Sequence, residues 1–75
     1  MTQQVSDVVV HIRRPLAAAA REQLELALRA TPGIHDVRGK AAQLLIVDFD
    51  RHAISALGVL RRFRALGQEA HLIGI

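Results

Sequence analysis

The sequence contains no cysteine, no tryptophan and no tyrosine. Without cysteine, the chain can form neither disulfides nor thiolate metal sites. Phe49 and Phe63 are the only phenylalanines, and both stand at positions where a core residue is expected. A sheet that stacks nucleic-acid bases needs exposed aromatic rings. We therefore expect no nucleic-acid binding by this mechanism.

Long apolar runs and targeting signals are also missing. No apolar run is long enough to span a bilayer. The first four residues, Met-Thr-Gln-Gln, lack the basic region and apolar stretch of a signal peptide. We expect a cytoplasmic protein without membrane insertion.

Apolar residues make up 51% of the 75-residue chain, which is enough for one packed domain over residues 1–75. Nine arginines and one lysine outnumber seven acidic residues, for a formal net charge of +3. An excess of this size suits an anionic partner, but it is more often explained by solubility.

Hydrophobic periodicity predicts six elements. Residues 5–12 are β-branched and alternate like a strand that ends before Pro15. Residues 16–30 carry a helical stripe, with Arg21, Glu25 and Arg29 forming an outward ladder. Residues 34–38 and 43–49 predict a hairpin whose turn contains Gly39.

A second helix is expected after Ser55, which is a suitable N-cap, and it should end near Gly67. Residues 70–75 then predict a last strand. The order βαββαβ, with short right-handed connections, favours an α+β ferredoxin-like sandwich. In that fold a four-stranded antiparallel sheet carries two helices on one face.

Three segments resemble those of heavy-metal-associated domains, the copper-chaperone-like domains that also occur in metal-pumping ATPases. The segments are residues 28–34 (LRATPGI) followed by Val37, residues 47–50 (VDFD) followed by Ile54 and Ser55, and Gly67. They follow the family's order, and the resemblance covers nearly the whole chain. The resemblance implies a ferredoxin-like fold and a role in metal transport.

The same resemblance places the family's metal-binding Cys-x-x-Cys on Ala17 and Ala20, and the residues before it on Arg14 and Pro15. Alanine has no donor atom for a soft ion such as Cu(I). The chain is therefore similar to a degenerate member of the family whose thiolate site is lost, and no cofactor is expected.

Arg13 and Arg14 follow the first predicted strand, where a helix begins. Basic side chains beside free amides can hold a carboxylate or phosphate, although solvated arginines are the simpler interpretation. Acylphosphatases are similar in fold and carry an arginine there, but they need an asparagine to place the attacking water. This chain has no asparagine.

Histidines offer a second candidate site. Antiparallel pairing of the first and last strands would set His11 opposite His71 on the open face of the sheet, where two imidazoles could share an ion. A further group is predicted at the other end of the sheet: His35, Asp36, Asp50 and His52. Ordinary surface histidines are the competing explanation for both clusters.

The third candidate is the open sheet face itself. The alternation directs several apolar side chains away from the helices: Val9, Leu44, Ile46, Ile73 and Ile75. A contiguous patch of this kind usually marks a protein partner or a homodimer interface. No paired carboxylates, phosphate loop or activated nucleophile is visible, so we expect no enzymatic activity.

Together these features predict a non-enzymatic accessory or docking module of a metal-handling system, which acts by protein–protein contact without thiolate metal binding. Two alternatives stay open. One is a dimeric regulatory domain that binds a small molecule or anion. The other is a histidine-based binder of Zn²⁺, Ni²⁺ or Cu²⁺.

Overall fold

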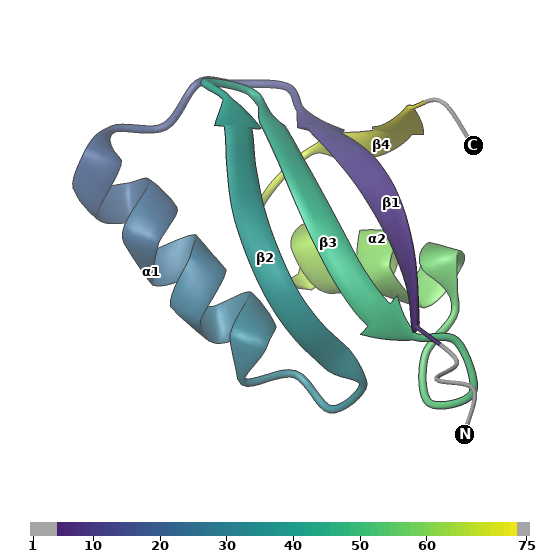
Figure 1. The fold of residues 1–75 in the computed structure, drawn as a ribbon. Helices are drawn as coiled ribbons and strands as arrows, with labels where there is room; N and C mark the ends of the chain where they lie inside the picture. Colours follow the sequence, from purple (N-terminus) through teal and green to yellow (C-terminus); the bar gives the residue numbers. More distant parts are fainter. Residues whose placement is uncertain (1–4, 74–75) are drawn as a thin grey trace.

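The computed structural model describes residues 5–73. Its elements are β1 (Val5–Ile12), α1 (Ala18–Arg29), β2 (Ile34–Ala41), β3 (Leu44–Asp50), α2 (Ala56–Ala65) and β4 (Ala70–Ile73). The strands form one antiparallel sheet in the order β2-β3-β1-β4 (Figure 1). The predicted ferredoxin-like arrangement is confirmed.

The core lies between the sheet and the two helices, on one side of the sheet. In β1 the inward side chains are Val8, Val10 and Ile12, as the alternation predicts, and all three are buried. Residues from both helices join the same cluster: Leu24, Leu28, Val59, Leu60 and Phe63. The opposite face of the sheet, toward the viewer in Figure 1, carries no helix among the described residues.

The ends of α2 follow the sequence prediction. The Ser55 side chain accepts a hydrogen bond of 2.9 Å from the backbone N–H of Gly58, which caps the helix. Gly67 follows the helix with a φ of +86°, a conformation that glycine adopts without steric cost. These two residues define where the second helix begins and ends.

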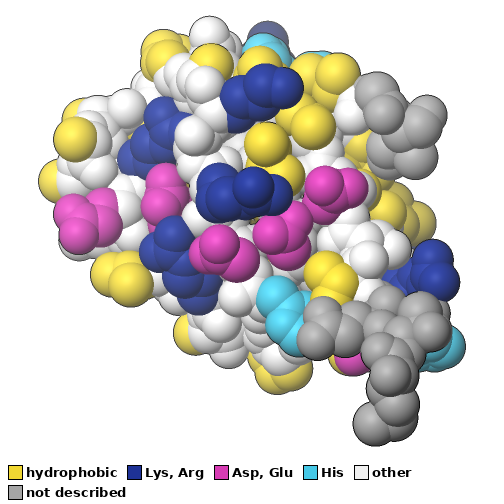
Figure 2. Space-filling model, in the orientation of Figure 1, with side chains coloured by type: hydrophobic (Ala, Val, Ile, Leu, Met, Phe, Trp, Pro, Cys, Tyr) yellow, Lys and Arg dark blue, Asp and Glu magenta, His cyan; other side chains and the backbone are white. Residues whose placement is uncertain are grey.

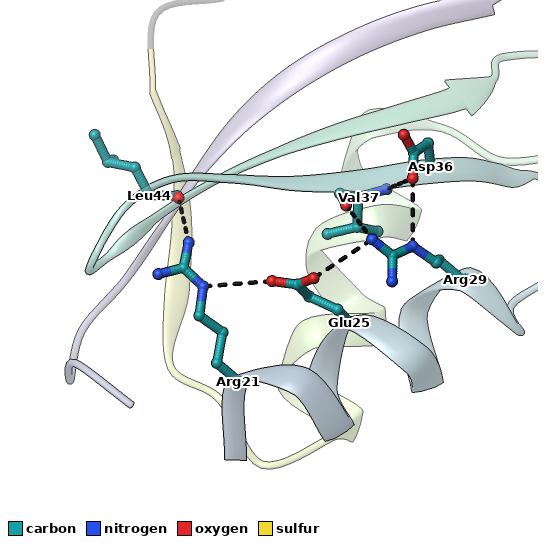
Figure 3. Close-up of polar contacts among 6 residues, drawn as sticks. All are labelled: Arg21, Glu25, Arg29, Asp36, Val37 and Leu44. Atoms are coloured by element: carbon teal, nitrogen blue, oxygen red, sulfur yellow. Dashed lines mark hydrogen bonds and ion pairs between the residues drawn. The ribbon is translucent and has the colours of Figure 1, made fainter. Parts of the chain in front are cut away.

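The polar ladder of α1 does not point into solvent, which corrects the sequence prediction. Arg21, Glu25 and Arg29 pair with one another at i, i+4 spacing but lie beside the sheet (Figure 3). Arg29 donates to the carbonyl oxygen of Val37 at 2.7 Å, and Arg21 donates to that of Leu44 at 3.3 Å. The ladder therefore ties α1 to the β2–β3 hairpin.

The hairpin turn also differs from the prediction. It lies at residues 42 and 43, so Gly39 falls inside β2 instead of in the turn. A Cβ atom at Gly39 would collide with the Arg21 guanidinium group. The glycine therefore marks a close approach to a helix side chain, which is a common reason for glycine within a strand.

No helix within residues 5–73 is long and apolar enough to cross a membrane.

Candidate functional site

Apolar side chains form a row across three strands on the open face. Val9 of β1 pairs with Ile46 of β3 on one side and with Ile73 of β4 on the other. Val9 and Ile46 are half-buried, and Ile73 is 38% exposed. Directly paired residues have Cβ atoms about 4.5–5.5 Å apart, so the row is continuous. Ile75, which the sequence places on the same face, lies outside the described residues.

A second row adjoins the first. His11 of β1 pairs with Leu44 of β3 and with His71 of β4, which is the register that the sequence prediction assumed. The two imidazole rings are 4.8 Å apart between centroids and tilted by 43°. The Nδ1 atom of His11 is buried and has no hydrogen-bond partner, whereas His71 is exposed. The structure thus brings the predicted histidine pair together.

Charged side chains occupy the neighbouring part of this face. Arg38 of β2 donates to the Asp48 carboxylate of β3 at 3.1 Å. Figure 2 shows hydrophobic side chains gathered next to acidic and basic ones on the side of the molecule that faces the viewer in Figure 1. The open face therefore combines an apolar part with a charged part.

The first loop, residues 13–17, is held in place from two sides. Arg13 forms an ion pair of 2.8 Å with Glu69, which directly precedes β4. The Gln43 side chain donates to the carbonyl oxygens of Ile12 and Arg13. A long-range ion pair and a side chain of the hairpin turn thus fix where the loop leaves β1.

A cleft of about 190 Å³ opens beside this loop. Its lining residues are Arg13, Arg14, Gly67, Gln68 and Glu69. Both predicted arginines lie here, but Glu69 offsets the charge of Arg13, so Arg14 supplies the net positive charge of the lining. A cation meets electrostatic repulsion from Arg14 at this end of the fold.

Ala17 and Ala20 mark the start of α1. Ala17 is the N-cap residue and makes no side-chain cap, Ala20 lies in the first turn, and both are exposed. Their methyl groups offer no donor to a metal ion. The residues present therefore do not fit the thiolate-bound ion that the sequence resemblance implies for these two positions.

The second predicted histidine cluster does not form. Asp36 accepts hydrogen bonds from Arg29 and from the backbone N–H of Val37. Asp50 accepts one from the backbone N–H of His52. Within residues 5–73, no group of three or more histidine, cysteine, aspartate or glutamate side chains is arranged to hold a metal ion.

One carboxyl group has a perturbed acidity. The backbone N–H of Val37, and next the Arg29 guanidinium, hold the pKa of Asp36 below its ordinary value of 3.8. Hydrogen bonds to the ionised form favour that form. Asp36 is engaged in tying α1 to β2, which explains its pKa without a catalytic role.

Sequence reasoning missed the residues that hold the first loop. Glu69 is 56 positions away from Arg13, and the pattern at Gln43 predicts only the start of a strand. No local pattern distinguishes these two residues from other exposed polar residues. Only the pairing of β1 with both β3 and β4 brings them to the end of β1.

No family model and no curated protein matches this sequence. Solved structures do match the fold. A copper-binding domain from HMA7, a P-type ATPase, has a TM-score of 0.81 at 20% identity, over 91% of this chain and 93% of that one. Oxidized MerP from Ralstonia metallidurans CH34 has a TM-score of 0.81 at 14% identity, over 93% of this chain and 99% of that one.

The N-terminal soluble domains of Bacillus subtilis CopA have a TM-score of 0.80 at 18% identity. That match covers 92% of this chain and 48% of the CopA chain, so this chain spans about half of that structure. The order of elements, the sheet topology and these likenesses agree with the resemblance found in the sequence. The chain has the fold of the heavy-metal-associated domains, built on a sequence without the Cys-x-x-Cys pair.

Proposed function

We propose that this domain is a non-enzymatic accessory module of a metal-handling system, which docks to protein through its open sheet face and does not bind metal through thiolates. The observation that supports the proposal is a fold shared with copper-binding domains in a chain without cysteine, in which the resemblance places the family's ligand pair on two alanines. The chain matches copper-binding domains over nine-tenths of its length, yet Ala17 and Ala20 stand at the start of α1.

The first loop supports this proposal in electrostatic terms. Arg14 lines the cleft next to the loop and carries a charge that Glu69 does not offset, because Glu69 pairs with Arg13. A cation at this end would find no donor atom on Ala17 or Ala20, and the positive charge of Arg14 would repel it. The loop is better suited to an acidic group on a partner protein.

The contiguous apolar side chains of the open face also support a docking role. The row Ile46–Val9–Ile73 places three aliphatic side chains side by side on a face that no described helix covers. A contiguous apolar patch surrounded by polar residues is typical of a protein–protein contact. The charged pair Arg38–Asp48 provides such a polar border.

A Cu(I) competition titration against a chromophoric chelator tests the loss of the thiolate site. We expect Cu(I) to stay bound to the chelator when the protein is added. The double variant Ala17→Cys, Ala20→Cys should withdraw copper from the chelator, and Ala17→Ser, Ala20→Ser is the matched control without thiolates. Tight Cu(I) binding by the unmodified protein would contradict the proposal, and failure of the cysteine variant would refute the assignment of these two positions.

Light scattering after size exclusion tests the docking surface with a second copy of the chain as the partner. We expect a dimer that Ile73→Glu dissociates, because a buried unpaired carboxylate is costly at an apolar contact. Leu26→Glu is the matched control, since Leu26 is 58% exposed on α1, away from the open face. A monomer at all concentrations, or equal effects of the two variants, would count against a homodimer.

A second candidate is an anion-binding regulatory domain, and the cleft beside the first loop favours it. Arg13 and Arg14 line that cleft, and the first turn of α1 has neither an acidic residue nor a side-chain cap. A thermal-shift titration with inorganic phosphate tests this candidate, because a ligand of the folded state raises the melting temperature. The shift should disappear in Arg14→Ala.

A further inference from the structure

The histidine pair on the edge of the sheet has a geometry that suits a shared ion. His11 and His71 are direct partners in the β1–β4 ladder, and their ring centroids are 4.8 Å apart. Each residue comes from a different strand of a hydrogen-bonded pair, so the backbone holds the two imidazoles at this separation.

The spacing can be compared with metal-ligand geometry. With metal–nitrogen bonds of about 2.1 Å, two imidazoles that share an ion have centroids about 4.5 Å apart at a right angle and about 5.2 Å apart at the tetrahedral angle. The observed 4.8 Å lies between these two values. The centroid separation of the pair is therefore compatible with a common ligand.

The Nδ1 atom of His11 provides a second, independent observation. It is the one buried side-chain nitrogen or oxygen without a hydrogen-bond partner among the described residues. Buried polar atoms nearly always have a partner, and an exception calls for an explanation such as a bound ion or water. An ion bound to the His11 Nδ1 would supply that partner.

We propose that His11 and His71 form a binding site for a borderline divalent cation, namely Cu²⁺, Ni²⁺ or Zn²⁺, on the open face of the sheet. Imidazole nitrogen suits these ions, and Cu²⁺ binds most tightly of the three to a given nitrogen site. This site is separate from the positions of Ala17 and Ala20 and does not depend on the proposed docking function.

The surroundings set the strength of the site. Leu44 flanks His11 on the side away from His71, and the ion pair Arg13–Glu69 just beyond β1 is neutral overall. Arg14, three residues after His11, keeps an uncompensated positive charge that weakens the binding of a cation at this end of the sheet. No third histidine, cysteine, aspartate or glutamate joins the pair within residues 5–73. Water completes the coordination, so we expect weaker binding than at a four-ligand structural zinc site.

A titration of tag-free protein with Zn²⁺, followed by NMR of the imidazole nitrogens, tests the site directly. We expect the His11 and His71 signals to shift together and saturate, while those of His35 and His52 stay in place. Equal shifts of all four histidines, or no shift at millimolar Zn²⁺, would overturn the proposal.

Thermal-shift measurements with CuCl₂ and ZnCl₂ provide the mutational test. The exposed position of His71 makes His71→Ala a variant that should fold normally, and it should weaken Cu²⁺ binding at least tenfold. His11→Ala should have the same effect on the metal response, and the double variant His35→Ala, His52→Ala is the matched control. Unchanged Cu²⁺ affinity in His71→Ala, or an equal loss in the control, would overturn the proposal.

Discussion

The substitution Arg29→Ala removes the most connected polar side chain between α1 and the sheet. Arg29 donates to the Val37 carbonyl oxygen at 2.7 Å, to Asp36 at 3.3 Å and to Glu25 at 3.4 Å (Figure 3). A hydrogen bond from a charged donor contributes about 1.5 kcal/mol at the low end of its range. Exposed ion pairs typically add about 0.2–1 kcal/mol each.

Since the Arg29 side chain is 41% exposed, solvent weakens all three contacts. We expect the free energy of unfolding to fall by about 1–2 kcal/mol. In a domain of this size, 1 kcal/mol corresponds to about 4–8 °C in melting temperature. The melting temperature should therefore fall by about 5–15 °C.

The same substitution changes how stability depends on pH. Asp36 has a folded pKa below 3.8, so its contribution is fully present above pH 3.8 and is lost as the pH falls through the lower folded value. Without Arg29 the pKa of Asp36 should rise toward 3.8. The rise should be incomplete, because the Val37 N–H, the larger cause of the shift, remains.

Urea unfolding followed by far-ultraviolet circular dichroism measures the stability change, since the chain has no tryptophan or tyrosine for a fluorescence assay. Carboxyl ¹³C NMR measures the pKa of Asp36. Arg64→Ala is the matched control, because Arg64 is exposed in the last turn of α2, as Arg29 is in that of α1. Equal destabilisation by the two substitutions, or an unchanged Asp36 pKa in Arg29→Ala, would refute the reasoning.

Three further substitutions test the packing. Gly39→Ala should lower the free energy of unfolding by about 1 kcal/mol, because the new methyl group displaces the Arg21 guanidinium from its hydrogen bond. In a protein that already carries Arg21→Ala, the same glycine substitution should lower it by less. Ser55→Ala should cost about 1 kcal/mol by removing the cap on the Gly58 N–H, with Ser55→Asp retaining most of the stability. Phe63→Ala should cost about 3–5 kcal/mol, since that side chain is fully buried, and urea unfolding that shows less than 1 kcal/mol would contradict the assigned core.

The fold could be predicted because each element carries its own signal. The local signals in the sequence are the alternation in residues 5–12 and 44–50, the capping residue Ser55 and the glycine at position 67. The structure gives that glycine a positive φ. The predicted hairpin turn at Gly39 is wrong, because a glycine in the sequence indicates either a turn or a close approach of another group. Its meaning at Gly39 depended on Arg21, which is far away in the sequence.

The candidate sites were predictable only in part. The sequence identified the histidines, the arginines of the first loop and the apolar residues of the open face, because residue type and alternation reveal them. It also grouped His35 and His52 with acidic residues that the structure uses elsewhere. Residue type alone does not say which partner a carboxylate finds.

By itself, the sequence determined the order of elements, the inward faces of the strands and the absence of a thiolate site, since these depend on local pattern and composition. Tertiary structure decided what depends on register and on contacts distant in sequence. It set His11 opposite His71, paired Arg13 with Glu69 and turned the ladder of α1 toward the sheet. A slip of one residue between β1 and β4 would place the two histidines on opposite faces, so only the folded sheet could define that pair.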